Sequence, residues 1–101
     1  MKKENNLRID VREYAALSNF LRGYLHADAA VEYGSPVAAA RQFRQDADER
    51  ETVIVHSELD RLLAETDRLP EHELARALED LGSSWHFRNR EEVERLRDSL
   101  K

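Results

Sequence analysis

His26 and Asp28 are the first residues whose types and spacing suggest chemistry. They flank Ala27 in a short polar string, and an imidazole close to a carboxylate can work as a general acid and base. The chain offers this pair no recognisable nucleophile, oxyanion loop or substrate cleft. We therefore predict no catalytic residues and interpret the protein as a non-enzyme.

The remaining histidines and the glycines do not extend this chemistry. No pair among the four histidines has the spacing of an H-E-x-x-H metal motif: His26, His56, His72 and His86. The chain has no cysteine, which excludes thiolate metal sites and disulfides. The three glycines fall in or near predicted helix ends and form no phosphate-binding loop. We predict neither a metal nor a cofactor.

The same polar string can instead be a recognition surface, formed by His26, Asp28, Glu32 and Tyr33. A structural interpretation stays open beside it. His26 and Asp28 would then satisfy backbone groups at the end of the first helix, and Tyr33 would pack under the second helix with its hydroxyl at the surface. Trp85 leaves the same two interpretations, because a lone tryptophan is most often a core residue but is also enriched at interface hot spots.

Charge is unevenly distributed along the chain, whose formal net charge is −5. Residues 44–68 hold eight acidic residues against four arginines, a balance of −4, whereas residues 1–23 hold five basic residues against three acidic ones, a balance of +2. This asymmetry argues against binding a nucleic-acid backbone and suits a basic protein partner. Asp46, Asp48 and Glu49 are the candidate contacts, and a merely solvated helix face is the alternative.

The elements that would position these residues are marked by helix-capping signals. Three capping boxes predict helix starts: Asp10 with Glu13, Asp48 with Glu51, and Asn89 with Glu92. Prolines at the first helical position, Pro36 after the cap Ser35 and then Pro70, predict two more starts. Gly82 predicts the end of a helix.

Apolar residues recur at helical spacing between these signals: Val11, Tyr14, Leu17, Leu21, Tyr24, Leu25; Val37, Ala40, Phe43, Ala47; Val53, Ile54, Leu59, Leu62, Leu63; Leu74, Ala75, Leu78, Leu81; and Val93, Leu96, Leu100. The β-branched triplet 53–55 has no partner strand, so we interpret it as buried helix. We predict an all-α fold, a single compact bundle of about five helices. Residues 1–9 are a predicted flexible segment, and residues 10–101 a single helical domain without a membrane span.

The string from Leu17 to Pro36 resembles the signature of immunity proteins of bacterial contact-dependent growth inhibition systems, the CdiI type. The order of an acidic helix over 58–63, a leucine helix ending at Leu81-Gly82, an aromatic loop over 83–87 and a short last helix is also similar to that family. Its members are small, helical cytoplasmic proteins that bind and silence one cognate toxin domain. Trp85 and His86 fall in the aromatic loop.

The resemblance implies an immunity protein that forms a cytoplasmic 1:1 complex with the toxic C-terminal domain of a surface-delivered effector. Toxins of such systems are often nucleases with basic clefts, so we expect a basic protein partner, and no direct binding of nucleic acid or membrane. The candidate toxin-binding residues are then His26, Asp28, Glu32, Tyr33, Asp46, Asp48, Glu49, Trp85 and His86.

Two other functions stay open. One is a helical adaptor or regulator in another pathway. The other is a helix-turn-helix DNA-binding antitoxin, which the charge pattern disfavours because the C-terminal arginines are interleaved with acidic residues and form no basic face: Arg88, Arg90, Arg95 and Arg97.

Overall fold

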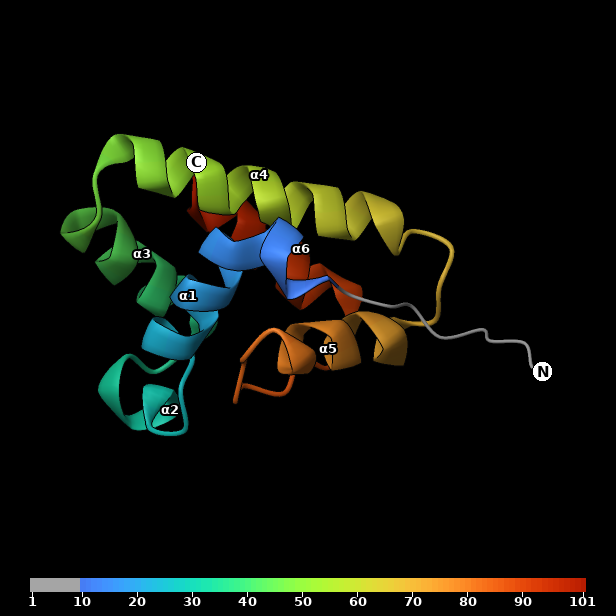
Figure 1. Ribbon diagram of the computed structural model, residues 1–101. Coiled ribbons are helices and arrows are strands. Elements are labelled where there is room, and N and C mark those ends of the chain that lie inside the picture. Colours follow the sequence, from blue (N-terminus) through green and yellow to red (C-terminus); the bar gives the residue numbers. More distant parts are fainter. Residues whose placement is uncertain (1–9) are drawn as a thin grey trace.

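Helices account for every regular element of residues 10–101, the part of the chain that the computed structural model describes (Figure 1). In chain order they are the 3-10 helix η1 (Val11–Tyr14) and the α-helices α1 (Ala15–Tyr24), α2 (Ala29–Glu32), α3 (Pro36–Asp46), α4 (Glu49–Glu65), α5 (Glu71–Asp80) and α6 (Arg90–Ser99). The prediction of an all-α fold is confirmed, and the five longer α-helices match the predicted number. The predicted flexible segment 1–9 lies outside the described residues.

Local capping explains most helix starts. The Asp48 carboxylate accepts the Glu51 N–H at 2.7 Å, and the Asn89 side chain accepts the Glu92 N–H at 3.0 Å. Ser35 Oγ accepts the Ala38 N–H at 3.1 Å, with proline next in the chain. Because these donors would otherwise lack partners, the caps define where α3, α4 and α6 begin.

Three predicted helix ends need comment. Asp10 caps η1 rather than an α-helix, because its carboxylate accepts the Arg12 N–H, and Pro70 is itself the cap residue of α5. Gly82 ends α5 as predicted. Its φ of +123° allows the Ser83 N–H to reach the Leu78 carbonyl at 2.9 Å, which is the Schellman arrangement that favours glycine.

The helices pack around one core. In Figure 1, α4 runs along one side of the molecule and α5 along the other, with α1 and α6 between them. Helix α1 packs against α4 and α3, and α6 packs against α3 and α4. The radius of gyration is 13.1 Å, as size scaling predicts for a compact chain of this length.

Two predicted core positions on α4 are wrong, and so is Val11. Val53 is 58% exposed, Ile54 42% and Val11 40%. The triplet 53–55 is helical as predicted, but only Val55 is buried, in line with Leu59 four residues later. Neighbouring positions differ by about 100° around a helix, so one apolar stripe cannot bury all three.

Several helix ends are capped by side chains from other helices. Tyr14, the residue that precedes α1, offers no capping side chain, but Glu58 of α4 accepts the Leu17 N–H at 2.8 Å. Ser18 Oγ donates to the Leu81 carbonyl at the end of α5 at 2.6 Å. Arg90 of α6 donates to backbone carbonyls in the last turn of α4, including that of Thr66 at 3.2 Å. These contacts satisfy polar backbone groups that helix termini leave unpaired.

Leucine truncation in the core should destabilise the protein strongly. Leu21, Leu62 and Leu78 have no exposed surface, and replacing each by alanine should cost about 2–5 kcal/mol through lost burial and a residual cavity. Urea unfolding midpoints measure the effect. Val53→Ala is the control and should stay near the parental midpoint; equal midpoints for all four variants would contradict the helix orientations described above.

Removing the cross-helix cap should have a smaller, specific cost. Glu58→Ala should lower stability by about 0.5–2 kcal/mol, the usual cost of a lost helix cap. Glu58→Gln keeps an acceptor oxygen for the Leu17 N–H and should lose less. If the two variants unfold at the same urea concentration, the cap contributes nothing measurable.

Candidate functional site

The turn between α1 and α3 holds four candidate residues close together. The Asp28 N–H donates to His26 Nδ1 at 3.1 Å, and His26 Nε2 lies 3.1 Å from Glu32 Oε1. The Nδ1 atom is therefore an acceptor, and Nε2 carries the proton that faces Glu32. Asp28 contacts the imidazole with its backbone and leaves its own side chain exposed. The pair does not have the carboxylate–imidazole contact of an acid–base couple.

Four aromatic rings connect this turn to α1 and α3. Tyr24 stacks on Phe20 with 5.7 Å between centroids and on Tyr33 with 5.9 Å, and Phe43 meets Tyr24 edge-on at 5.3 Å. Tyr33 is half-buried against the core. Packing, which was one of the two interpretations left open for Tyr33, is therefore part of its role. Sequence reasoning did not include Phe20 in the core, although the structure buries it fully.

The acidic candidates lie beside these rings, at the corner between α3 and α4. Tyr24 donates its hydroxyl to Asp46 Oδ2 at 2.7 Å, and Gln42 donates to Oδ1 at 2.9 Å. Burial, followed by the bond to Asp46, raises the pKa of Tyr24 to about 12. The hydroxyl therefore stays protonated at neutral pH and holds the Asp46 carboxylate in place. This Tyr24–Asp46 contact is a feature that sequence reasoning missed.

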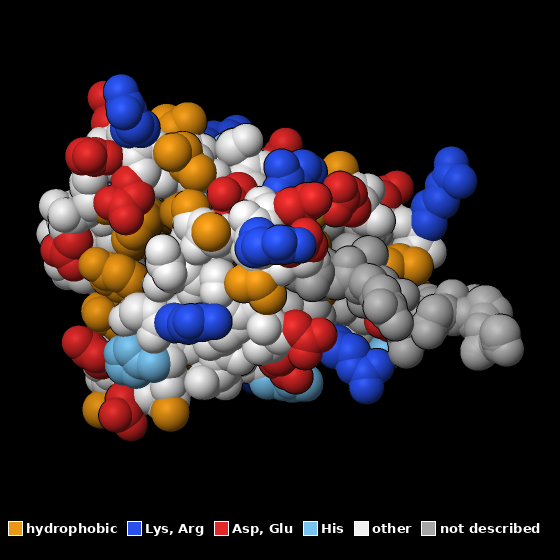
Figure 2. All heavy atoms as spheres, viewed as in Figure 1, with side chains coloured by type: hydrophobic (Ala, Val, Ile, Leu, Met, Phe, Trp, Pro, Cys, Tyr) orange, Lys and Arg blue, Asp and Glu red, His pale blue; other side chains and the backbone are white. Residues whose placement is uncertain are grey.

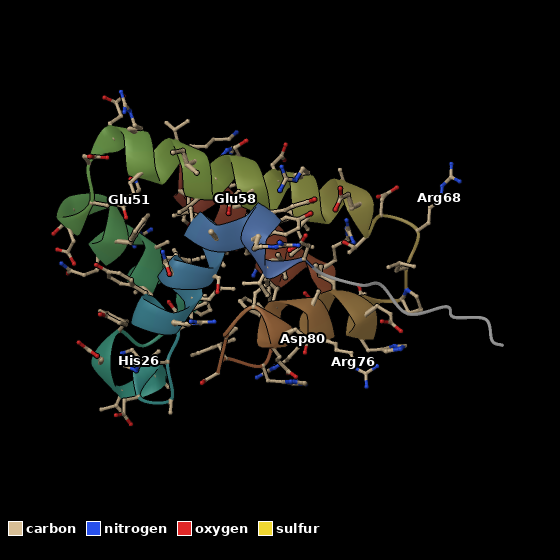
Figure 3. All side chains as sticks on the ribbon, viewed as in Figure 1. His26, Glu51, Glu58, Arg68, Arg76 and Asp80 are labelled. Atoms are coloured by element: carbon tan, nitrogen blue, oxygen red, sulfur yellow. The ribbon has the colours of Figure 1, made fainter. Side chains whose placement is uncertain are left out.

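We define the acidic end as Asp46, Asp48, Glu49 and Glu51. Within residues 10–101, no arginine, lysine or histidine lies within ion-pair distance of these four carboxylates. Figure 2 shows acidic side chains bordering an apolar band at the end of the molecule formed by α2, α3 and the start of α4. In Figure 3, the labelled His26 and Glu51 belong to this same end, and Asp80 belongs to α5.

Trp85 and His86 lie in the loop between α5 and α6. The Ser84 N–H donates to the Leu25 carbonyl at 2.8 Å, which ties this loop to the end of α1, next to His26. Trp85 is half-buried against the core, and the exposed His86 lies 2.7 Å from Glu79. The structure thus links the loop to the turn through the backbone, while no bond links it to the acidic end.

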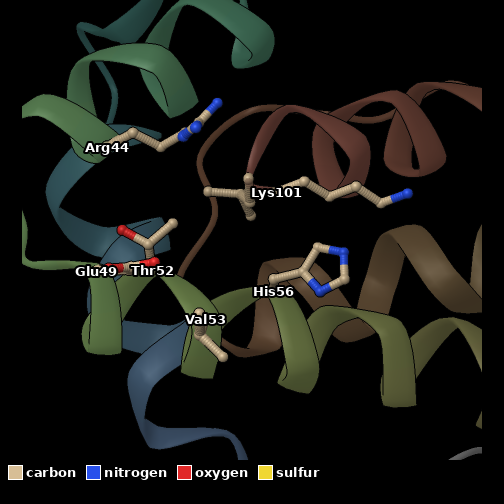
Figure 4. Close-up of a pocket in the computed structure, with 7 residues that line it drawn as sticks. Arg44, Glu49, Thr52, Val53, His56 and Lys101 are labelled. Atoms are coloured by element: carbon tan, nitrogen blue, oxygen red, sulfur yellow. The ribbon is translucent and has the colours of Figure 1, made fainter.

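A separate pocket of about 340 Å³ adjoins the acidic end (Figure 4). Glu49, Arg44 and Lys101 are among its lining residues, so it carries charges of both signs. His56 also lines it, with a buried Nε2 that has no hydrogen-bond partner. Among residues 10–101, no three potential ligands come together as a metal site, and no helix has the length and apolar content to cross a membrane.

The geometry describes a binding surface: exposed carboxylates, an aromatic cluster and two tethered loops. The family model for the CdiI immunity protein matches residues 13–97, nearly the whole chain. No curated protein and no solved structure matches the chain. The resemblance found in the sequence is thereby confirmed, and so is the interpretation as a non-enzyme, since members of the family are non-enzymatic inhibitors. This chain belongs to the CdiI immunity protein family, whose members neutralise toxins of contact-dependent growth inhibition.

Proposed function

We propose that the protein binds a basic nuclease toxin, the C-terminal domain of its cognate effector, in a cytoplasmic 1:1 complex. We further propose that residues 10–101 act as one toxin-binding domain. Family membership supports the toxin as the partner, and the unpaired carboxylates at the acidic end support its basic character. Complementary charge of this kind accelerates encounter and adds specificity.

The distribution of ion pairs supports the choice of the acidic end as the contact surface. Arginines of α6 are paired within the protein: Arg95 lies 3.0 Å from Glu91 and Arg97 lies 3.1 Å from Asp60. Their positive charge is therefore compensated locally, whereas Asp46, Asp48 and Glu49 carry charge that no described cation compensates. The least compensated negative charge on α3 and α4 faces solvent at one end of the molecule.

The turn and the aromatic loop extend this surface in the proposal. His26, Asp28, Glu32 and Tyr33 continue it beyond Asp46, because Tyr24 contacts both Tyr33 and Asp46. Trp85 and His86 form its other part, through the tether between Ser84 and Leu25. A standard interface buries about 800 Å² on each partner, and a domain of this size would use a sizeable share of its surface.

Charge reversal at the acidic end should weaken toxin binding without unfolding the protein. We would change Asp46, Asp48 and Glu49 to lysine together and measure association with the C-terminal domain of the effector encoded upstream. Association should slow most, and its salt dependence should become shallower, because steering is lost. Asp48→Asn is the control, since it keeps a helix cap while removing one charge.

Circular dichroism and urea unfolding establish that the triple variant is folded. Unchanged affinity and unchanged salt dependence in a folded triple variant would reduce the acidic end to a solvated face. Failure of the parental protein to bind any effector fragment would refute the proposed function and favour the adaptor alternative.

Single alanine variants should separate contact residues from structural ones in the two loops. Asp28→Ala should weaken toxin binding and leave the thermal midpoint near parental, because the Asp28 side chain is exposed. Trp85→Ala should lower both, because Trp85 packs partly against the core. His26→Ala removes the acceptor of the Asp28 N–H and should lower stability slightly. Calorimetric titration and thermal unfolding of the same samples provide the two readouts, and parental binding by all three variants would exclude the loops from the interface.

A further inference from the structure

A groove of about 160 Å³ opens at the acidic end, between α1, α3 and the start of α4. Its apolar part is made by the rings of Phe20, Tyr24 and Phe43, and its acidic part by Asp46 and Glu51. No basic side chain lines it. The pocket next to it, by contrast, is lined by Arg44 and Lys101 and is not suited to a cation.

The two kinds of lining favour one kind of ligand. Aromatic faces attract cations, and carboxylates bind them through charge-assisted hydrogen bonds. A guanidinium group satisfies both at once, because it is planar, can stack on a ring, and presents several N–H donors to a carboxylate. An ammonium group lacks the flat face for stacking.

The Asp46 carboxylate is already held in position. It accepts one hydrogen bond on each oxygen, from Tyr24 and from Gln42. Each carboxylate oxygen can accept a second bond, so two acceptor positions stay available for an incoming donor. Because the side chain is fixed before binding, little conformational entropy is lost when a ligand arrives.

We propose that this groove receives an arginine side chain of the toxin, stacked against the aromatic rings and bonded to Asp46 and Glu51. The inference rests on the proposed function for the identity of the partner, but the cation-binding property belongs to the groove itself. It specifies which chemical group of the toxin the acidic end recognises, beyond a general attraction between opposite charges.

The groove is tested first on the isolated protein, without any toxin. Ethylguanidinium is titrated into the ¹⁵N-labelled protein, and the amide signals of Asn19, Ala47 and Glu51, which line the groove, are followed by NMR. These signals should shift in a saturable manner. The response should disappear in the Asp46→Asn/Glu51→Gln variant. It should persist in the Asp80→Asn/Glu71→Gln variant, which removes two exposed charges on or before α5 that make no ion pair among the described residues.

Ethylammonium is the second probe, and it should shift the same signals less. An equal response to both probes would overturn the arginine assignment, because it would mean that any cation is attracted. Absence of saturable shifts, or the same shifts in both double variants, would overturn the groove as a cation site whether or not the protein neutralises a toxin.

The second test uses the toxin complex. Asp46→Asn/Glu51→Gln should weaken toxin binding about tenfold or more, as expected for a lost hydrogen-bonded charge pair. The control pair Asp80→Asn/Glu71→Gln should change it much less, although the net charge changes equally. Asn19→Trp should also weaken binding, by filling the groove from an exposed position on α1.

Equal weakening by the two double variants would refute the groove as the contact and leave the proposed function standing. If the parental protein binds no toxin, the proposed function fails, and the ethylguanidinium titration still decides whether the groove is a guanidinium site.

Discussion

The contact between Glu58 and the first turn of α1 is the interaction on which the arrangement of this small protein depends. Helix α1 lies between α4 and the helices that carry the candidate site, and its own sequence offers no capping side chain at Tyr14. The Glu58 carboxylate satisfies the Leu17 N–H from α4. A buried N–H without a partner is costly, so this bond favours one placement of α1 along α4.

Once α1 is placed, its C-terminal half positions the functional surface. Phe20 and Tyr24 lie one turn apart on α1 and contact Phe43 of α3 from the same side. Tyr24 then holds the Asp46 carboxylate at the end of α3. The same residue thus belongs to the packing of the domain and to the geometry of the acidic end. Aromatic residues often combine these roles, because a large apolar ring carries a polar group at its tip.

The distribution of charge gives this end of the molecule its distinct character. Elsewhere, acidic side chains are paired with arginines or accept backbone hydrogen bonds, as Glu91, Asp60 and Glu58 do. At the acidic end, Asp46 and Asp48 accept hydrogen bonds from neutral donors and retain their full charge. Neutral donors fix a carboxylate without compensating it, so the negative field remains available to a partner. A small inhibitor that must capture its target rapidly benefits from such a surface.

The sequence by itself determined the helical class, the starts of α3, α4 and α6, and the Gly82 stop, because capping and the 3.6-residue period act within a few residues of each other. It also identified most of the buried leucines and the family signature. Only the tertiary structure decided that Val53 and Ile54 face solvent, that α2 forms, and that Glu58, Ser18 and Arg90 cap other helices. The Tyr24–Asp46 bond and the tether from Ser84 to Leu25 belong to this second group. They join residues 22 and 59 positions apart, and such contacts depend on how the helices cross, which no local pattern encodes.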